Sequence, residues 1–201
     1  MDTQTIRVNY KEYPECMFAM LSAFLPQDEG HDLRRVAGDV VFRSTDSDGN
    51  TYKNGLLHSY DHLPAFVNGT RHEWYKDGVL HREGDLPALV DTYSNEWWVD
   101  GQRHREGGLP AIVDIYHTSW WVNGRRHREG DLPAIIWDDV EEEWYVNGYR
   151  HREGGLAAVI SRTSQQWWVN GQRHREGGLP ALIYYYNSSI YREMWVNDVR
   201  Q

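Results

Sequence analysis

One sequence motif recurs through most of this 201-residue chain at a nearly constant interval. Its clearest copy runs from Trp97 to Ala111 and reads Trp-Trp-Val-Asp-Gly-Gln-Arg-His-Arg-Glu-Gly-Gly-Leu-Pro-Ala. The steps between successive copies are 23, 23, 23, 24 and 23 residues. A fixed period in this range is typical of repeat architectures, in which each unit stacks on its neighbours. The histidine of the motif falls at His58, His81, His104, His127, His151 and His174.

The composition favours strands and tight turns over helices. Ten Trp and thirteen Tyr supply much of the 40 % hydrophobic content. Aromatic side chains are enriched in strands. The formal net charge of −9 argues against a generally basic nucleic-acid binder, although a local basic stripe is compatible with an acidic average.

Other features of the sequence indicate an intracellular protein. Cys16 is the only cysteine, so we expect no internal disulfide framework. The N-terminus shows no basic segment followed by an apolar run, so we expect no secretory signal. No stretch approaches the ~20 uninterrupted apolar residues that are needed to span a membrane.

Residues 1–39 lack the repeat, and we predict that they form an N-terminal helical cap and linker. Pro14 suits a first helical residue, and apolar residues then recur at helical spacing until Pro26. A short amphipathic helix over residues 14–25 would cover the first hydrophobic edge of the array, or alternatively dock a partner. Cys16 would then be a buried apolar residue rather than a nucleophile.

Residues 40–201 predict an all-β fold, an elongated antiparallel meander of about seven stacked β-hairpins. Each unit offers two strands of about five or six residues. One begins at the Ala of Leu-Pro-Ala, because proline suits a strand's first residue, and the other ends at Val-Asn-Gly. An eight-residue link, such as Gln102 to Leu109, would lead to the next hairpin.

Clusters of Asn, Asp, Ser and Gly predict the hairpin turns. We expect turns at residues 46–50, 68–69 and 94–95, and one with an extra residue around 138–139. The last unit is predicted to have a turn longer by about four residues, with several tyrosines over residues 184–191.

Two aromatic positions precede Asn-Gly in each unit, and strand alternation would point them to opposite faces. The predicted structural ladder combines the first of these positions with the repeated histidine. Its residues are Trp74, Trp97, Trp120, Trp144, Trp167, His81, His104, His127, His151 and His174.

This pattern resembles the MORN (membrane occupation and recognition nexus) repeat, a β-hairpin unit with the same period. The matching elements are the period, the aromatic pair before Asn-Gly, and the Gly-x-Arg-His segment that follows. The particular form Trp-Trp-Val-Asn-Gly-x-Arg-His-Arg-Glu looks like the MORN-like proteins of amoeba-infecting giant viruses, especially marseillevirus-like ones. The resemblance covers residues 40–198 and implies a scaffold that often self-associates.

The repeated His-Arg-Glu segment suggests two enzymatic interpretations, and the spacing disfavours both. Equivalent histidines in neighbouring hairpins should lie roughly 9–10 Å apart, whereas ligands of one zinc lie within ~4 Å of each other. A His–Glu acid–base pair, such as His104 with Glu106, would recur in almost every unit, but an active site needs different residues converging in a pocket. We therefore expect no catalytic residue, metal or cofactor, and a structural role for these side chains.

Two arginines per unit would form two rows along one edge of the array. One interpretation is a phosphate-facing surface for nucleic acid or anionic lipid. The other, which we favour, is that each arginine pairs with an acidic residue or packs its stem on a tryptophan. The arginines are Arg103, Arg105, Arg126, Arg128, Arg150, Arg152, Arg173 and Arg175.

The last hairpin is the candidate for self-association. A terminal hairpin leaves an open sheet edge, and this one adds aromatic residues where a polar cap would be expected. We predict a two-fold dimer through residues 182–196, the alternative being a locally packed end. The residues concerned are Tyr184, Tyr185, Tyr186, Ile190, Tyr191, Met194 and Trp195.

These features predict a non-enzymatic repeat scaffold that binds itself and other proteins, viral or host. It would act inside the cell, as a virion component or in the host cytoplasm, with the host nucleus a further location. The alternative function is a binder of anionic surfaces, either nucleic acid or membrane phosphate.

Overall fold

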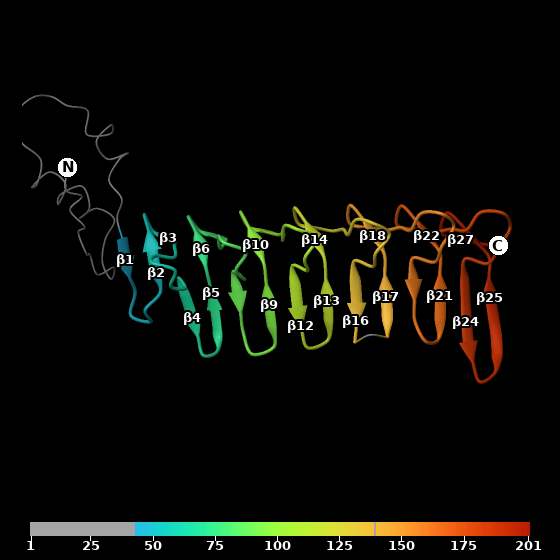
Figure 1. Cartoon of the computed structure of the whole chain (residues 1–201), viewed down its shortest axis with the longest axis horizontal. Coiled ribbons are helices and arrows are strands. Elements are labelled where there is room, and N and C mark those ends of the chain that lie inside the picture. The colour runs from blue at the N-terminus through green and yellow to red at the C-terminus, as the bar shows by residue number, and fades with distance from the viewer. Residues whose placement is uncertain (1–42, 139) are drawn as a thin grey trace, which may run out of the picture. The chain divides into compact units, whose positions relative to one another are not determined.

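The structure is a computed structural model that describes residues 43–138 and 140–201 (Figure 1). The chain divides into two compact units, residues 1–79 and 80–201. The predicted helix over residues 14–25 and Cys16 lie outside the described residues. Within the described ranges, no helix has the length and apolar character needed to cross a membrane.

The first unit contains two longer hairpins, as predicted. Strand β1 pairs with β2 across residues 46–50, and β4 pairs with β5 across residues 69–70, within one residue of the predicted turn. The strands are β1 (Arg43–Thr45), β2 (Thr51–Lys53), β3 (Leu56–Leu57), β4 (Phe66–Asn68), β5 (Arg71–Glu73) and β6 (Tyr75–Lys76), and β7 (Val79–Leu80) starts at its last residue.

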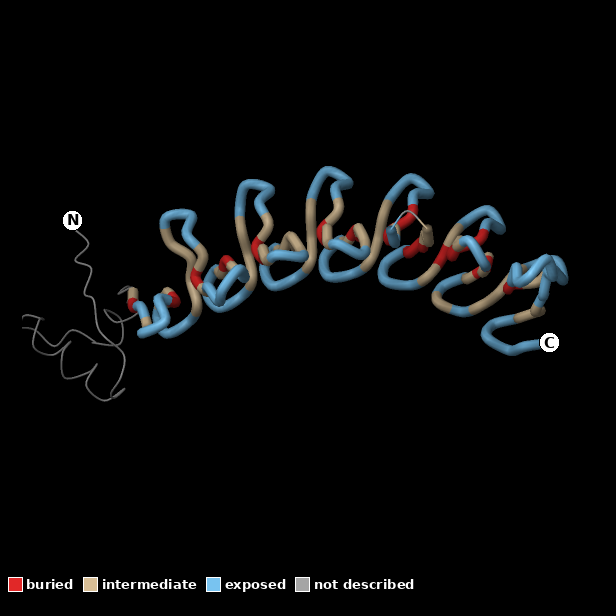
Figure 2. Tube along the Cα trace, turned by 90° about the horizontal axis from the view of Figure 1, so that it is seen from below, coloured by how far each residue is buried: buried red, intermediate tan, exposed pale blue. Residues whose placement is uncertain are grey.

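The second unit contains five longer hairpins that form one antiparallel meander, ending at β25. Neighbouring hairpins pair through β9–β12, β13–β16, β17–β20 and β21–β24. In Figure 2 they follow one another along a gently curved row. The strands are β8 (Leu89–Val90), β9 (Ser94–Glu96), β12 (Ile112–Asp114), β13 (His117–Ser119), β16 (Ile135–Trp137), β17 (Glu141–Glu143), β20 (Val159–Ile160), β21 (Ser164–Gln166), β24 (Leu182–Tyr186) and β25 (Ser189–Glu193).

Each repeat of the second unit also contains a shorter hairpin, which the sequence interpretation missed. The strand predicted to reach Val-Asn-Gly ends earlier, at Ser119 in β13, and the predicted link from Gln102 begins with a strand. The short hairpins lie along one side of the row of longer ones (Figure 1). Their strands are β10 (Trp98–Val99), β11 (Gln102–Arg103), β14 (Trp121–Val122), β15 (Arg125–Arg126), β18 (Tyr145–Val146), β19 (Tyr149–Arg150), β22 (Trp168–Val169), β23 (Gln172–Arg173), β26 (Trp195–Val196) and β27 (Val199–Arg200).

The Asn-Gly dipeptide explains the short hairpin. Asn123 and Gly124 have φ angles of 47° and 74°, and positive φ at both central residues is the signature of a type I′ turn. This turn reverses the chain within two residues, so Arg125 and Arg126 pair directly with Val122 and Trp121. The Asn-Gly segment therefore closes a hairpin of its own.

The last longer hairpin corrects the prediction of an enlarged turn. Asn187 and Ser188 form a two-residue turn with positive φ, and the additional residues lengthen β24 and β25 to five residues each. The turn predicted near residues 94–95 also lies earlier, because those residues belong to β9. The turn predicted around residues 138–139 lies where the pairing of Trp137 with Glu141 requires one, although residue 139 itself is outside the described residues.

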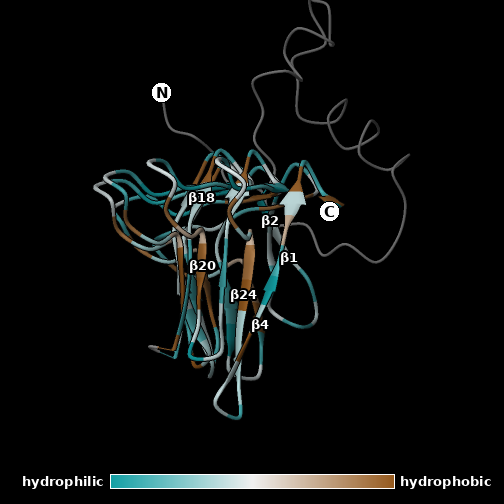
Figure 3. Ribbon diagram, turned by 90° about the vertical axis from the view of Figure 1, so that its right-hand side faces the viewer, coloured by the Kyte–Doolittle hydropathy of each residue, from teal (hydrophilic) through white to brown (hydrophobic). Residues whose placement is uncertain are grey.

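The core consists of alanine, aliphatic and aromatic side chains, with Ile135 among the largest that are fully buried. The Ala that follows Leu-Pro is completely buried in each Leu-Pro-Ala copy, as at Ala111, whose amide donates to the Ser119 carbonyl at 2.9 Å. Its carbonyl accepts from the amide of Trp97 in the preceding repeat at 2.8 Å. The first tryptophan of the motif is buried at residues 74, 120, 144 and 167 and partly buried at Trp97, whereas the leucine before the proline, Leu109, is exposed. Figure 3 views the hairpins from one end of the row and colours each residue by its hydropathy.

Main-chain hydrogen bonds connect successive short hairpins. The Gly124 amide donates to the Arg103 carbonyl of the preceding repeat at 3.0 Å, and Gly148 and Gly171 make equivalent bonds at 2.9 Å. Each repeat is therefore stabilised mainly by its nearest neighbours.

Candidate functional site

The repeated histidine links each repeat to the next. His104 Nδ1 accepts a hydrogen bond from the Asn123 amide at 3.1 Å, and His104 Nε2 lies 2.8 Å from Glu106 Oε1. Because Nδ1 accepts, the neutral ring carries its proton on Nε2, which donates to the carboxylate. The same amide-to-Nδ1 bond, at 3.1–3.2 Å, is made by His58, His81, His127 and His151.

The two ends of this histidine ladder differ. His174 Nδ1 is buried and has no hydrogen-bond partner among the described residues. At the other end, His58 Nδ1 lies 3.1 Å from the Asp77 carboxylate. Burial lowers the pKa of His58, and Asp77 opposes this effect. Lys53 lies 2.8 Å from Asp77, and its hydrogen bond holds the pKa of that carboxyl below the ordinary value.

The arginines of the first row stack between aromatic rings of successive repeats. The Arg103 guanidinium lies 4.7 Å from the ring centroid of Trp98 in its own repeat and 5.3 Å from Trp121 in the next. The other three arginines make the same double contact at 4.8–5.8 Å. Cations and rings thus alternate along the second unit, and each such contact is attractive. The first row consists of Arg103, Arg126, Arg150 and Arg173.

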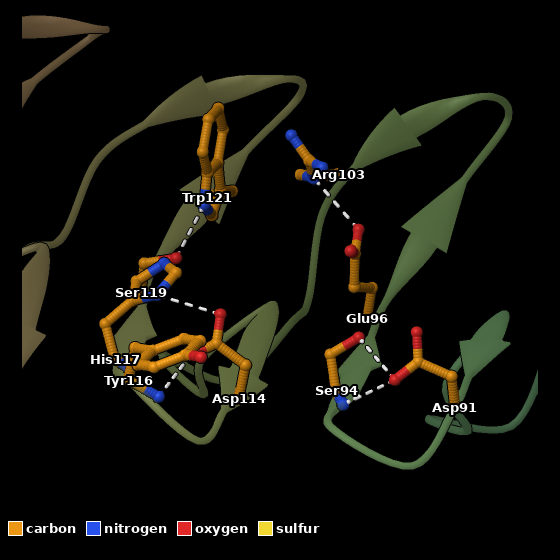
Figure 4. Close-up of polar contacts among 9 residues, drawn as sticks. All are labelled: Asp91, Ser94, Glu96, Arg103, Asp114, Tyr116, His117, Ser119 and Trp121. Carbon is orange, nitrogen blue, oxygen red and sulfur yellow. Dashed lines mark hydrogen bonds and ion pairs between the residues drawn. The ribbon is translucent and has the colours of Figure 1, made fainter.

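Carboxylates hold two arginines of the first row. Arg103 Nε donates to Glu96 Oε2 at 3.1 Å (Figure 4). Arg150 donates through Nε and Nη2 to Glu143 Oε2, both at 2.8 Å. Glu143 is only 3 % exposed and also accepts from the Tyr145 hydroxyl at 2.9 Å.

The other two arginines of the first row have no carboxylate in their own repeat. Ser119 stands at the position of Glu96, as Figure 4 shows, and Gln166 stands there in the later repeat. The Nε atoms of Arg126 and Arg173 are buried without a hydrogen-bond partner in the described part of the chain. Both guanidinium groups stack on aromatic rings, and Arg173 Nη2 also donates to Gln166 Oε1 at 3.3 Å.

The second row lies over the first tryptophan of each motif. The guanidinium carbons of its arginines lie 3.6–3.8 Å from the ring centroids of Trp97, Trp120, Trp144 and Trp167. In each case Nη1 donates to the carbonyl just before the buried alanine, at 3.1–3.2 Å. The second row consists of Arg105, Arg128, Arg152 and Arg175.

Charge balance in the second row alternates from repeat to repeat. Arg105 and Arg152 each donate Nε and Nη2 to both oxygens of an aspartate in the preceding repeat, at 2.7–3.0 Å. Arg128 and Arg175 face a glycine at that position, and burial lowers the pKa of both. They belong to the same repeats as Arg126 and Arg173 of the first row, so every second repeat carries two arginines that no carboxylate of residues 43–138 or 140–201 holds. The alternating position is Asp85, Gly108, Asp131 and Gly155.

A further pair, Asp114 and His117, lies at the turn between β12 and β13. His117 Nδ1 is 2.9 Å from Asp114 Oδ2 (Figure 4), and the imidazole stacks on Trp137 with a centroid distance of 4.7 Å. Sequence reasoning missed this pair because it lies outside the motif. No group of three or more His, Cys, Asp or Glu side chains in residues 43–138 and 140–201 could hold a metal.

The last hairpin exposes most of the residues predicted for self-association. Tyr184, Tyr185, Tyr186, Ile190 and Tyr191 have exposed fractions between 39 % and 66 %. The remaining two, Met194 and Trp195, are only partly exposed, and Trp195 packs against the cluster of Ala157, Trp167 and Ala181. Strand β25 is the terminal strand of the sheet, and among the described residues it pairs only with β24.

Sequence reasoning predicted that the arginines pair with acidic residues, but it did not identify the partners, which stand at positions that vary from repeat to repeat. The usable signal was the alternation of Gly-Asp-Leu-Pro with Gly-Gly-Leu-Pro, at residues 84–87 and 107–110 for example. Comparison of the chain with protein-family models, with curated proteins and with solved structures gives no match.

Proposed function

We propose that this protein is a non-enzymatic repeat scaffold that associates with itself and with other proteins. The observation that carries the proposal is the terminal strand β25, which is open on one side and surrounded by exposed aromatic side chains. Natural sheets usually shorten, charge or cover such an edge, because an open ladder pairs readily with another strand. Here the edge strand is five residues long, compared with three in β13.

In an antiparallel pair, the main-chain groups of successive residues point alternately toward and away from the partner strand. This alternation determines which amide and carbonyl groups of β25 are free to bond to another strand. Tyr186 and Ser189 flank the two-residue turn, so Ser189, Tyr191 and Glu193 bond toward β24. The Tyr185 amide bonds to the Thr163 carbonyl on the opposite side at 2.9 Å, which agrees with this phase. Ile190 and Arg192 therefore direct their amide and carbonyl groups toward the open edge.

A second copy of the chain fits this edge. In a two-fold antiparallel pairing about Tyr191, Ile190 of one copy bonds with Arg192 of the other, and the two Tyr191 rings face each other. Cross-strand aromatic pairs of this kind contribute roughly 0.2–1 kcal/mol each. The pairing would extend the meander from one copy into the next.

The internal bonding of the repeat supports a structural rather than a catalytic role. Five of the six repeated histidines bond to the next turn, and the eight arginines of the two rows stack on tryptophan or tyrosine rings. Because the same set of side chains recurs, no single copy gathers the different groups that an active site requires.

The biological setting that we propose follows the resemblance of the repeat to the MORN-like proteins of giant viruses. The protein would serve as a virion component or as a factor in the host cytoplasm or nucleus. Partners beyond the second copy would be viral or host proteins. The wording of the repeated motif is the support for this setting.

Binding of nucleic acid or anionic lipid by the arginine rows is the second candidate function, and it has weaker support. Four of the eight arginines are held by Glu or Asp, and all eight stack on aromatic rings. Titration of DNA, RNA and phosphoinositide vesicles at low and high salt tests this candidate. Absence of binding at low salt would remove it.

Light scattering of the full chain tests the self-association proposal. We expect a mass of twice 23.6 kDa that falls toward the monomer on dilution. Ile190→Pro removes an amide that points away from β24, so the hairpin should persist while the dimer is lost. Tyr116→Ser, which alters an exposed tyrosine in an inner hairpin, is the matched control and should leave the dimer intact. A monomer at every concentration, or a dimer insensitive to Ile190→Pro, would contradict the proposal.

A further inference from the structure

Asp and Gly alternate at the position that faces the second row of arginines. Where Gly stands there, the arginine has no carboxylate to complete the ion pair that its counterparts make. Arg105 and Arg175 occupy the same pose: each stacks on its tryptophan at 3.7–3.8 Å, and each donates Nη1 to a proline carbonyl at 3.2 Å. In Arg105 the Nε and Nη2 edge binds Asp85. In Arg175 the same edge faces Gly155 and has no partner among the described residues.

The space beside the two arginines differs accordingly. Equivalent pockets lie between neighbouring motifs, one lined by Asp85 and Arg105 and the other by Gly155 and Arg175. The first has a volume of about 300 Å³ and the second about 470 Å³. A Cβ atom placed on Gly155 would meet nothing within 4 Å, so the position of the missing carboxylate is open.

We propose that Arg175 and this pocket bind a carboxylate side chain, Asp or Glu, of a peptide segment in a partner protein. Asp85 on Arg105 and Asp131 on Arg152 provide the template, because both carboxylates accept Nε and Nη2 in a bidentate manner. Hydrogen bonds between an ionised guanidinium and an ionised carboxylate are shorter and stronger than hydrogen bonds between neutral groups. This inference rests on the proposed scaffold function and specifies the chemistry of its partner.

The surroundings of Arg175 favour a carboxylate over a phosphate. Glu153 and Glu176 also line the pocket, and they would repel a doubly charged phosphate more strongly than a singly charged carboxylate. The lack of a carboxylate also agrees with the lowered pKa of Arg175, which burial causes.

The pocket also favours a peptide over a small free carboxylate. Trp167 and Trp168 line it, and Leu156 and Leu179 contribute exposed apolar surface, each with 48 % of its area accessible. A small acid would leave this apolar surface in water, whereas residues flanking an acidic side chain would cover it.

Arg128 offers a second position of the same kind. It stacks on Trp120 at 3.6 Å, donates Nη1 to the Pro133 carbonyl at 3.1 Å, and faces Gly108. Two repeats correspond to four strands, or roughly 20 Å at the usual strand spacing. A partner with two acidic side chains at that separation would occupy both positions.

The test uses the full chain with labelled arginine, in which NMR follows the Nε–Hε signals of Arg105, Arg128, Arg152 and Arg175. The probes are an acetylated and amidated Leu-Glu-Leu tripeptide, its Leu-Gln-Leu counterpart, sodium acetate and sodium phosphate. We expect Leu-Glu-Leu to shift only the Arg128 and Arg175 signals, with an affinity about tenfold or more above that of Leu-Gln-Leu. Equal responses from all four arginines would overturn the proposal.

Two matched variants locate the site. Gly155→Asp should abolish the response of Arg175 and leave Arg128 unchanged, because Asp at that position adopts positive φ in this chain, as Asp131 does with 53°. Asp131→Gly should make Arg152 respond. A response of Arg175 that survives Gly155→Asp would overturn the proposal.

The remaining probes distinguish the source of the anion. Tighter binding of phosphate than of acetate would overturn the assignment to a carboxylate. Equal affinities for acetate and Leu-Glu-Leu would overturn the assignment to a peptide. Light scattering detects failure of the dimer independently, so failure of the peptide site can be distinguished from failure of self-association.

Discussion

The inner hairpins of the second unit and its last hairpin share one sequence pattern but have different surroundings. In the hairpin β12–β13, both strands pair with a neighbouring hairpin, and Ile112 and Ser119 are buried. In β24–β25 the strands are longer, β25 pairs on one side only, and Tyr186 is 66 % exposed. The repeated unit therefore acquires most of its burial from its neighbours.

This comparison explains the distribution of stability that we expect. A single hairpin is marginally stable in water, and a repeat array gains stability at the interfaces between units. Inner repeats have two such interfaces, whereas the last repeat has one. The last repeat also lacks the amide bond to His174 Nδ1 that the other histidines of the ladder have. The same substitution should therefore cost more free energy of unfolding in an inner repeat.

Loss of a motif tryptophan should give the largest effect. Trp120→Ala removes a side chain that is 8 % exposed, that donates Nε1 to the Gly108 carbonyl at 2.8 Å, and that supports Arg128. We expect a loss of about 3–5 kcal/mol in the free energy of unfolding. Trp195 stands at the second aromatic position, as Trp121 does, so Trp121→Ala is the matched inner variant. Trp195→Ala should cost about half as much as Trp121→Ala, because the last repeat has a neighbouring repeat on one side only. Urea unfolding followed by circular dichroism measures both, and equal losses would contradict the nearest-neighbour account.

Loss of a buried carboxylate should rank second. Glu143→Ala leaves Arg150 without its carboxylate, and we expect a cost of about 3 kcal/mol. Glu193→Ala in the last repeat breaks the exposed pair with Arg200, at 3.2 Å, and should cost less than about 1 kcal/mol. Unfolding midpoints of the two variants measure the difference. A greater cost for Glu193→Ala would show that the inner pair does not stabilise the array.

The histidine ladder should give a smaller difference. His127→Ala removes the acceptor of the Asn147 amide, at 3.2 Å, and should cost about 1 kcal/mol. His174→Ala removes a ring whose Nδ1 has no partner within the described ranges, so its cost should be close to zero. Amide hydrogen exchange at Asn147 and Asn197 is the direct readout. Unchanged protection of Asn147 in His127→Ala would argue against a bond between repeats.

The smallest effect should be the pH dependence of the first ladder position, His58. Its pKa is lowered by burial, so the folded state favours the neutral ring, whose Nδ1 accepts the Asp77 amide at 3.1 Å. The contribution to stability is present above the ordinary histidine pKa, about 6.5, and is lost as the pH falls through the lowered value. Hydrogen exchange at Asp77 should accelerate relative to a histidine-free reference as the pH falls below about 6.5. His58→Gln keeps an acceptor and should remove this dependence, and a dependence that persists would assign it to another group.

Much of the fold could be predicted from the repeat, and the errors have physical causes. The period predicts seven longer hairpins, and seven are present in the described residues, including the turn at residues 46–50. The short hairpin was missed because Asn123-Gly124 was interpreted as the end of a strand, although Asn-Gly favours a type I′ turn. The residues after it, Arg125 and Arg126, then pair back on Val122 and Trp121.

The candidate sites were predicted less completely. The arginine rows were identified from the sequence, and their stacking on tryptophan was the favoured interpretation. Pairing with acidic residues was also predicted, but the Asp partners of the second row were not identified, because Asp85 and Arg105 are 20 residues apart and belong to different repeats. Of the seven residues predicted for self-association, five are exposed, whereas Met194 and Trp195 are partly buried. Trp195 packs inward because it is the ring of the last repeat against which Arg173 stacks, at 4.8 Å.

The sequence by itself determined the repeated unit, the strand-rich fold and the irregularity of the last copy, because period, turn residues and aromatic positions are local properties. Only the tertiary structure decided in which repeats the arginines are paired with a carboxylate. Whether Arg105 or Arg175 finds a carboxylate depends on a residue in the preceding repeat, Asp85 or Gly155, which only the stacking brings opposite it. It also decided that β25 is the open edge, since an edge is defined by the absence of a further pairing strand and not by its own residues.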